Sequence, residues 1–451
     1  MVVSMTRRTF LASAALTAFT QPAKPNIIVI LADDLGYKDL GYAGGPQQTP
    51  HLDGLAKGGL RLEHFYTYPL CSPTRSALLT GRNPIRFGLA YSVVRPWAYY
   101  GLPADEELLP AAFQRAGYQT AIVGKWHLGH ANRKLHPRSR GFDHFYGHLN
   151  GAIDYNTHDR NGGIDWQRNG VSVKEEGYTT DLFASEAVRW LRGRDPARPY
   201  FLYLPFNAPH TPLQAPQALI DKYAAIRNPK RRTYAAMVDA LDQAVGKILD
   251  AVDLSNTIVF FASDNGGPRG SGADNGLLRE GKATTYEGGI RVLGFVHAPG
   301  RLKARVSKQV MTMWDVLPTL AGAAGVELHT KKRLDGMNLW PVLTGQEPVV
   351  ARSGLFFCTQ PESGVKQYAV RDGDWKMVRT MTTPLREELF HIAEDPYERN
   401  NVLGNEYAMA GTMRKLLDDW IALHPPGDVM YSVAPHPGWV APSDWAKAVV
   451  E

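Results

Sequence analysis

Cysteine is scarce in this chain. Cys71 and Cys358 are the two cysteines among 451 residues, and two cysteines cannot build the disulfide framework of a small secreted domain. Cys358 lies in the apolar, strand-like run GLFFCTQ, where it is expected to pack as a small hydrophobic side chain. Cys71 lies in YPLCSPTRSALLTGR, just ahead of a helix-like segment, and requires a separate explanation.

Long apolar runs and basic blocks are also missing. No segment offers the roughly eighteen uninterrupted apolar residues of a membrane span, so stable membrane insertion is not expected. The net charge is +6, but no Lys/Arg-rich block carries it. We therefore expect an anionic small molecule or polysaccharide as partner and no nucleic acid. Ordinary solvated surface charge explains the excess equally well.

The first 23 residues have the features of an export signal. Arg7-Arg8 precede an apolar run from Phe10 to Phe19, which is too short to cross a bilayer and resembles a bacterial twin-arginine signal. Cleavage near Ala23 is expected, although no clean Ala-x-Ala site is present. A frayed basic N-terminus is the alternative. The segment predicts a periplasmic or secreted protein that uses the twin-arginine export machinery.

Strand-like and helix-like segments alternate through residues 24–333. This order predicts an α/β fold with a doubly wound, mostly parallel sheet and helices on both faces. The expected strands lie in 26–34, 118–126, 199–210 and 256–266, and the expected helices in 106–117, 180–193 and 231–252. Residues 334–451 change in character and predict a smaller antiparallel sheet, a helix near 406–423 and an irregular tail.

Two expected strands end in pairs of oxygen-bearing side chains. Asp33 and Asp34 follow the first strand, and Asp264 and Asn265 follow the last strand of the larger region. Ligands of such sheets bind beyond the carboxyl ends of the strands, and hard oxygen ligands suit Ca²⁺ or Mg²⁺. Helix capping and turn formation are the alternative roles of these residues.

Cationic and imidazole side chains also follow the strands. Lys125 and His127 lie two residues apart in GKWHLG, His210 lies between prolines in APHTP, and Lys282 lies on a glycine-flanked loop. Gathered around a divalent metal, these groups would suit an oxyanion bound by two ligating atoms. Each residue alone is also compatible with a surface or core position.

Cys71 is expected at the N-terminus of a helix, with Pro73 in the first turn. Exposed amides and the helix dipole favour an anion at that position. A thiolate nucleophile there would need a base, and His127 or His210 could serve. A buried structural cysteine is the alternative.

The motif Cys71-x-Pro73-x-Arg75 with SALLTGR resembles the signature of type I sulfatases. Further motifs agree in order between Asn26 and Val402: NIIVILADDLGYKDLGYAG, TPHLDGLAKGGLRLEHFYT, GYQTAIVGKWHLG, APHTP, SDNGG, GKATTYEGGIRV and ELFHIAEDPYERNNV. The resemblance implies an alkaline-phosphatase-like fold, with a signal peptide (1–23), a catalytic domain (24–333) and a small C-terminal α+β subdomain with its tail (334–451).

The resemblance also implies the cofactors and the residue roles. Cys71 would be oxidised to Cα-formylglycine by a maturation enzyme, and Asp33, Asp34, Asp264, Asn265 and the modified residue 71 would ligate one calcium ion. Arg75 would hydrogen-bond the formylglycine, and Lys125 and Lys282 would bind sulfate oxygens. His210 would protonate the departing alcohol, and His127 would help to remove the proton that releases the sulfate. Tyr286 departs from the tryptophan of many relatives and raises a question about substrate shape.

Formylglycine gives a physical reason for the cysteine. The hydrated aldehyde offers one hydroxyl to attack sulfur and a second from which the sulfate is expelled, whereas a serine or thiol would leave a stable adduct. Residues 72–75 would then serve largely as the recognition sequence for maturation.

The substrate is predicted from a more local resemblance. Residues 139–159 and the helix after them are most similar to arylsulfatase B-type N-acetylgalactosamine-4-sulfatases, which implies a sulfated sugar of the chondroitin or dermatan kind or an algal polysaccharide. The alternatives are a formylglycine-dependent phosphonate or phosphodiester hydrolase and a non-catalytic sulfated-glycan binding protein.

Overall fold

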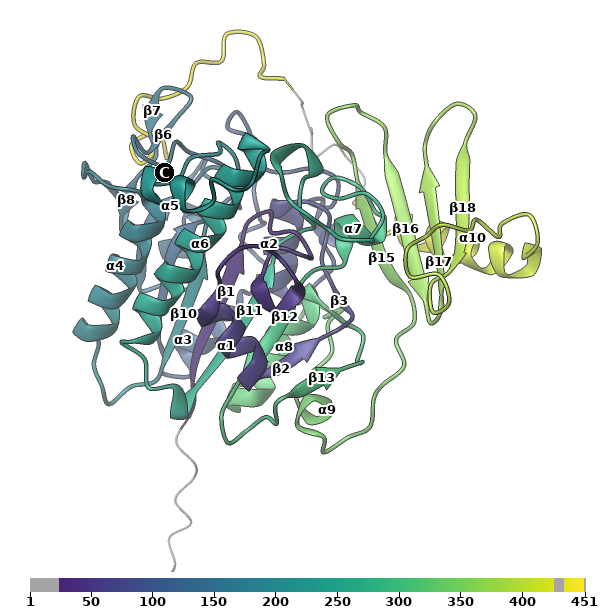
Figure 1. Cartoon of the computed structure of the whole chain (residues 1–451), viewed down its shortest axis with the longest axis horizontal. Helices are drawn as coiled ribbons and strands as arrows, with labels where there is room; N and C mark the ends of the chain where they lie inside the picture. The colour runs from purple at the N-terminus through teal and green to yellow at the C-terminus, as the bar shows by residue number, and fades with distance from the viewer. Residues whose placement is uncertain (1–23, 426–433, 450–451) are drawn as a thin grey trace, which may run out of the picture.

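The computed structural model describes residues 24–425 and 434–449. A ten-stranded sheet with helices on both faces forms the larger part, and a four-stranded sheet lies beside it (Figure 1). The predicted export signal over 1–23 lies outside the described residues. Within 24–425 and 434–449, no helix has both the length and the apolar character required to cross a bilayer.

The centre of the large sheet is parallel, as predicted. In the order β11-β1-β10-β4-β5 the neighbouring strands all run in the same direction, and antiparallel pairs extend the sheet on both sides. The full order is β13 (Arg305–Ser307), β2 (Leu60–Leu62), β12 (Gly294–His297), β11 (Thr257–Ser263), β1 (Asn26–Ala32), β10 (Tyr200–Pro205), β4 (Gln119–Lys125), β5 (His144–His148), β8 (Gln167–Arg168) and β9 (Val171–Ser172).

Helices cover both faces because the central strands are apolar on both sides. Along β1, Ile27, Val29 and Leu31 join one hydrophobic core and the residues between them join the other, as the two-residue period of a strand requires. One core contains α2 (Cys71–Thr80), α3 (Leu109–Arg115), α8 (Val316–Ala324) and α10 (Tyr407–Ile421); the other contains α1 (Pro50–Gly58), α4 (Thr179–Gly193) and α6 (Pro229–Leu249).

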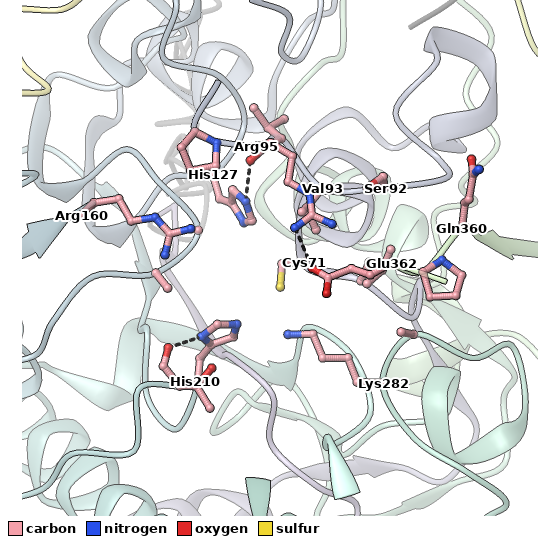
Figure 2. A pocket seen from close by; sticks show the side chains of 18 of the residues that line it. Cys71, Ser92, Val93, Arg95, His127, Arg160, His210, Lys282, Gln360 and Glu362 are labelled. Atoms are coloured by element: carbon pink, nitrogen blue, oxygen red, sulfur yellow. Dashed lines mark hydrogen bonds and ion pairs between the residues drawn. The ribbon is translucent and has the colours of Figure 1, made fainter. Parts of the chain in front are cut away.

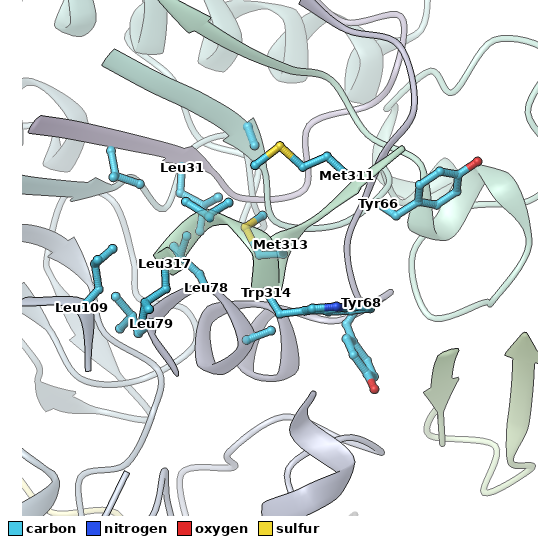
Figure 3. Close-up of a cluster of buried hydrophobic side chains, with 14 of the residues drawn as sticks. Leu31, Tyr66, Tyr68, Leu78, Leu79, Leu109, Met311, Met313, Trp314 and Leu317 are labelled. Atoms are coloured by element: carbon cyan, nitrogen blue, oxygen red, sulfur yellow. The ribbon is translucent and has the colours of Figure 1, made fainter. Parts of the chain in front are cut away.

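The core beneath α2 fixes the position of Cys71. Leu78 and Leu79 are fully buried and lie among Leu31, Leu109 and Leu317 (Figure 3). Gly81 ends the helix at φ 66°, and its amide donates to the carbonyl of Ala77. Glycine adopts this left-handed conformation without the Cβ penalty.

The smaller sheet is antiparallel throughout, with strands β15 (Leu355–Thr359), β16 (Gln367–Asp372), β17 (Trp375–Thr380) and β18 (Arg386–His391). Lys376 joins it to the larger part, because its buried Nζ lies 2.9 Å from Glu287 Oε1 and 2.8 Å from Glu398 Oε1. Cys358 is fully buried in β15, in the larger of the two cores. The domain boundary at 333/334 stays a prediction.

The remaining elements are short. They are the strand pairs β3 (Phe65–Tyr66) with β14 (Met311–Thr312) and β6 (Asp159–Arg160) with β7 (Gly163–Ile164), and the helices α5 (Gln217–Lys222), α7 (Glu287–Ile290) and α9 (Trp340–Thr344). The Glu287-Gly288-Gly289 segment begins α7, and β12 follows at Gly294.

Candidate active site

The oxygen-bearing pairs lie at the carboxyl ends of two adjacent strands. Ala32 at the end of β1 is in register with Ser263 at the end of β11, so Asp33-Asp34 and Asp264-Asn265 leave the sheet side by side. The Asp34 amide donates to Asp264 Oδ1 at 3.2 Å, and Asn265 Nδ2 donates to Asp34 Oδ1 at 2.8 Å. Parallel packing therefore brings together residues that are about half the chain apart.

The backbone at this cluster is strained. Asp34 has a φ of 70° and His127 a φ of 56°, and the left-handed region is costly for residues other than glycine. Such conformations persist where the surrounding structure over-determines them, and they concentrate at functional sites.

Cys71 begins α2 and faces the carboxylates, as predicted. Its Sγ lies 3.5 Å from Asp33 Oδ1, and ligand atoms of Cys71, Asp33, Asp34 and His210 all lie within 4.8 Å of one another. Burial and the neighbouring Asp33 raise the pKa of the thiol to about 12. In the protein without a bound cation, the side chain is therefore a neutral thiol at physiological pH.

Arg75 and Lys125 lie behind the carboxylates and are fully buried. Arg75 donates from Nη2 to Asp264 Oδ2 at 2.9 Å and from Nη1 to the Lys125 carbonyl at 3.0 Å, while Lys125 Nζ contacts Asp33. Although burial opposes ionisation, Lys125, His210, Arg75 and Lys282 together hold the pKa of Asp33 well below its usual value. Burial and the proximity of Asp33 raise the pKa of Asp264 to about 7.

Residues 72–75, which follow Cys71, also form hydrogen bonds in the folded protein. Ser72 Oγ donates to the His127 carbonyl at 2.8 Å and accepts from the Val94 amide at 3.0 Å. Thr74 Oγ1 donates to the Tyr68 carbonyl at 3.0 Å. Residues 72–75 therefore connect α2 to the loops around the site, so the expectation that they are largely a maturation signal was too narrow.

Lys282 and two histidines face the open side of the cluster. Lys282 Nζ lies 2.6 Å from Asp34 Oδ1, and although burial favours the neutral amine, Asp34 raises the pKa of Lys282 above its usual value. His210 Nε2 lies 3.6 Å from Asp34 Oδ2. Burial and Lys282 lower the pKa of His210 to about 4, and burial with Lys125 lowers that of His127 well below its usual value.

The two imidazoles differ in which nitrogen is free. His210 Nδ1 lies 2.6 Å from the Thr211 carbonyl, and His127 Nε2 lies 3.0 Å from the Val94 carbonyl. Because a carbonyl can only accept, each of these nitrogens carries the hydrogen. The unprotonated nitrogens are therefore Nε2 of His210, which faces Asp34, and Nδ1 of His127, which is buried without a hydrogen-bond partner among the described residues.

A cavity of about 810 Å³ opens above Cys71. Of the predicted residues, Cys71, His127, His210 and Lys282 line it (Figure 2), whereas Lys125 and Arg75 lie beneath its floor. Sequence reasoning missed Arg95, Arg160 and Glu362, which also line this cavity. They belong to loops or a two-residue strand without a motif, and no pattern in the sequence distinguishes them from other surface charges.

The donor set fits a hard divalent cation. Asn265 Oδ1 is buried and has no hydrogen-bond partner among the described residues, so an oxygen ligand is left free beside three carboxylates. Ca²⁺ prefers carboxylate and amide oxygens, and a cation would also relieve the repulsion among Asp33, Asp34 and Asp264. These carboxylates with Asn265 and residue 71 are the residues that would hold the ion.

Other polar side chains near the site contact one another within the protein. His144 pairs with Glu186, and His158 stacks on Trp166 with ring centroids 4.5 Å apart. Tyr286 contacts Glu388 of the small sheet and packs under Arg279. Tyr286 is not among the residues that line the cavity, and the question of substrate shape that its departure from the family pattern raises stays open to test.

The fold and the site together define an α/β enzyme whose cleft accepts an anionic ester. Its floor carries a cysteine and an oxygen cluster, and its walls carry lysine and histidine at the carboxyl ends of parallel strands, where doubly wound proteins bind their ligands.

Comparisons with known proteins identify the family. Residues 25–326 match the sulfatase family and residues 281–422 match the C-terminal region of N-sulphoglucosamine sulphohydrolase. The chain is 39% identical to arylsulfatase J of Mus musculus (88% of this chain, 75% of the relative) and 35% identical to N-acetylgalactosamine-6-sulfatase of Canis lupus familiaris (86% and 84%). The crystal structure of Ps i-CgsB in complex with k-i-k-neocarrahexaose superposes with a TM-score of 0.83 at 33% identity, over 93% of this chain and 95% of that chain.

The chain therefore belongs to the sulfatase family and is a sulfuric ester hydrolase. The predicted alkaline-phosphatase-like fold and the type I family are confirmed. The finer likeness to arylsulfatase B-type enzymes stays a prediction, as do the roles of the individual site residues.

Proposed function

We propose that this enzyme hydrolyses a sulfate monoester on a sulfated sugar, with a formylglycine derived from Cys71 and one bound Ca²⁺. The observation that carries the proposal is the position of Cys71, which begins α2 at the floor of the cavity with its Sγ 3.5 Å from Asp33. Formylglycine would supply the oxygen nucleophile that attacks sulfur, and Ca²⁺ would supply positive charge at the sulfuryl oxygens.

The protein's own cations support binding of the sulfate. Lys282 lines the cavity and is held at Asp34 in the protein alone, so a substrate sulfate would draw its ammonium group toward the sulfuryl oxygens. Lys125 would act from beneath the floor. Positive charge placed where negative charge develops stabilises the transition state, and a dry, preorganised site strengthens that effect.

The histidines suit the two proton transfers. His210 Nε2 faces the cavity floor, and the charge of a bound sulfate raises the pKa of a neighbouring imidazole, so His210 would gain the proton that it donates to the departing alcohol. His127 Nδ1 has no hydrogen-bond partner among the described residues, which suits the acceptance of a proton from residue 71 when the sulfate is released.

Two relatives support a sugar as the alcohol. One is an N-acetylgalactosamine-6-sulfatase and the other was solved in complex with a neocarrahexaose. The cavity of about 810 Å³ has room for more than one sugar ring. An N-acetylgalactosamine sulfate or a sulfated algal galactan is the proposed class. We further propose export to the periplasm or exterior, and maturation by a formylglycine-generating enzyme before use.

The test combines mass spectrometry with kinetics. The native protein should carry formylglycine in the peptide containing residue 71, and it should turn over aryl sulfates and sulfated sugars. Cys71→Ala should lower kcat/KM at least about a thousandfold, whereas the matched Cys358→Ala should keep the aldehyde and the activity. Full activity with an intact thiol, or an aryl phosphodiester preferred by orders of magnitude over the sulfate, would contradict the proposal.

A further inference from the structure

The cavity contains one arginine whose charge no acidic side chain neutralises. Lys282 is paired with Asp34, and Arg95 Nη1 lies 3.1 Å from Glu362 Oε1. Arg160 also lines the cavity, but it has no ion pair and no side-chain hydrogen bond within residues 24–425 and 434–449. Its guanidinium extends into the cavity from the side opposite Lys282 and Glu362 (Figure 2).

The position of Arg160 is fixed by its backbone. It ends β6, which pairs with β7, and its carbonyl accepts from Trp445 Nε1 at 3.0 Å. The side chain is half-buried, and its Nε atom is buried without a hydrogen-bond partner among the described residues. A buried donor without a partner carries a desolvation cost, and this cost is removed when a ligand accepts from it.

The surroundings of Arg160 favour an anion. Burial lowers the pKa of Arg160, Asp165 partly opposes that effect, and the positive charge of Arg95 lowers the pKa further. Two guanidinium groups thus repel each other across the cavity, and Glu362 neutralises only Arg95. A planar guanidinium presents its donors in a fork that matches a carboxylate or sulfate in two-point contact.

We propose that Arg160 binds a second oxyanion of the substrate, so that the preferred substrate is a glycan with another carboxylate or sulfate near the sulfate that is cleaved. This inference rests on the proposed sulfatase function. It assigns the first oxyanion to the cluster at Cys71 and Lys282 and the second to Arg160 on the opposite wall.

Glu362 reinforces the selectivity. It lies between β15 and β16, and its side chain is 75% exposed. Its carboxylate forms the ion pair with Arg95 from the solvent side. An anionic substituent on that side of the sugar meets the Glu362 carboxylate, whereas one on the opposite side meets Arg160. Selectivity for the position of the second charge follows from this asymmetry.

The test compares disaccharides that share one sulfated galactose or N-acetylgalactosamine and differ in the neighbouring sugar, which carries a carboxylate, a sulfate or neither. The wild-type enzyme should prefer the doubly charged substrates at least tenfold in kcat/KM. Arg160→Gln should bring that preference close to one, a loss of about tenfold or more, mainly through KM, because the contact exists in both the ground state and the transition state. Arg160→Lys should keep part of the preference.

Controls separate the possible failures. The exposed Arg227→Gln removes the same charge away from the cavity and should keep the wild-type preference, and melting curves should show that all variants fold. Equal preference in wild type and Arg160→Gln would overturn this inference. Failure of aldehyde-bearing wild-type enzyme to hydrolyse even 4-nitrophenyl sulfate would overturn the proposed function instead. Comparison of the disaccharide that carries a carboxylate with the one that carries a second sulfate identifies which second oxyanion Arg160 binds.

Discussion

Single side chains at this site differ in whether their polar atoms are already satisfied. Asn265 is the clearest case, because its Nδ2 donates to Asp34 Oδ1 and to the Gly266 carbonyl while its buried Oδ1 has no partner among the described residues. An amide oxygen that has no partner and lies beside three carboxylates is suited to bind a cation. The proposed Ca²⁺ site can therefore be tested without any substrate.

Asn265→Ala is expected to weaken Ca²⁺ binding at least about tenfold, because it removes one oxygen ligand from the cluster. The measurement is the calcium-dependent rise in melting temperature, which follows the ratio of free ion to Kd. The matched Asn156→Ala changes an exposed asparagine and should keep the wild-type response. An unchanged calcium response in Asn265→Ala would exclude Asn265 as a ligand.

Contacts between elements hold the sheet edge and the site loops in place. At the edge, Glu186 of α4 accepts from Arg168 of β8 at 3.1 Å and lies 2.7 Å from His144 Nε2 of β5. Its side chain is 3% exposed. Burial opposes ionisation, but His144, Arg189 and Arg168 outweigh it and lower the pKa of Glu186 to about 2.

The lowered pKa of Glu186 determines how the free energy of unfolding changes with pH. The unfolded chain binds the proton near pH 4.5 and the folded chain only near pH 2, so the stabilisation is complete above pH 4.5 and is lost as the pH falls through 2. Glu186→Gln should therefore lower the free energy of unfolding at pH 7 by roughly 2 kcal/mol, and the difference from wild type should shrink below pH 4.5. Denaturant unfolding at several pH values measures it.

Glu176→Gln is the control for that series, because Glu176 is exposed on the same stretch of chain and its replacement should have little effect at any pH. A gap between wild type and Glu186→Gln that stays constant from pH 7 to pH 3 would contradict the ionic account and leave only a packing role for Glu186.

The loop after β11 touches the segment around α7 so closely that no side chain fits between them. A Cβ added at Gly266 would lie 1.8 Å from the Gly288 carbonyl oxygen, whereas one at Gly270 would meet nothing within 4 Å. Gly266→Ala must therefore displace backbone on the loops that carry Asn265 and Lys282. We expect a lower melting temperature and at least a hundredfold loss of kcat/KM, with Gly270→Ala close to wild type. Wild-type activity in Gly266→Ala would show that these loops can separate freely.

For the whole molecule, the burial of Cys71 leads us to expect that the proposed maturation precedes folding. Its exposed fraction is 2%, so an enzyme that oxidises the thiol needs the chain before α2 packs. We expect a peptide spanning residues 68–82 or the unfolded chain to be converted, and the folded unmodified protein to resist. Peptide mass spectrometry after incubation with the maturation enzyme measures this.

We expect the proposed export to follow the proposed oxidation. If Arg7-Arg8 directs a folded protein across the membrane, a variant with both arginines changed to lysine should accumulate in the cytosol with the aldehyde already formed. A cytosolic precursor that carries only the thiol, next to an exported protein that carries the aldehyde, would contradict this order.

Features that depend on local hydrophobic pattern, and on the residues that directly follow the strands, could be predicted from the sequence. Doubly buried strands such as β1 and β11 have apolar interiors and are followed directly by Asp or Asn, so their place in a parallel sheet and the meeting of Asp34 with Asp264 could be predicted. The small sheet was predicted from short strands and turns. The depth of Lys125 could not be predicted, because Lys125 is the last residue of β4 and a shift of one residue in the strand decides which way such a side chain points.

The rim of the cavity escaped prediction for a related reason. Arg95 and Glu362 lie on loops and Arg160 on the two-residue strand β6, and their meeting depends on how segments far apart in the sequence pack together, which no local pattern encodes. Lys376 is an example of packing between distant segments. This strand lysine can be buried because it forms ion pairs with Glu287 and Glu398, which belong to other segments of the chain.

The hairpin tip between β15 and β16 belongs to the small sheet, yet residues 360–363 line the cavity of the large one. Of the residues that line the cavity, those at 360–363 come from the small sheet, whereas Cys71, His127, His210 and Lys282 come from the larger part. Because this turn reaches the cavity from the small sheet, its residues can be exchanged on an unchanged β15–β16 ladder without altering Cys71 or the carboxylates around it.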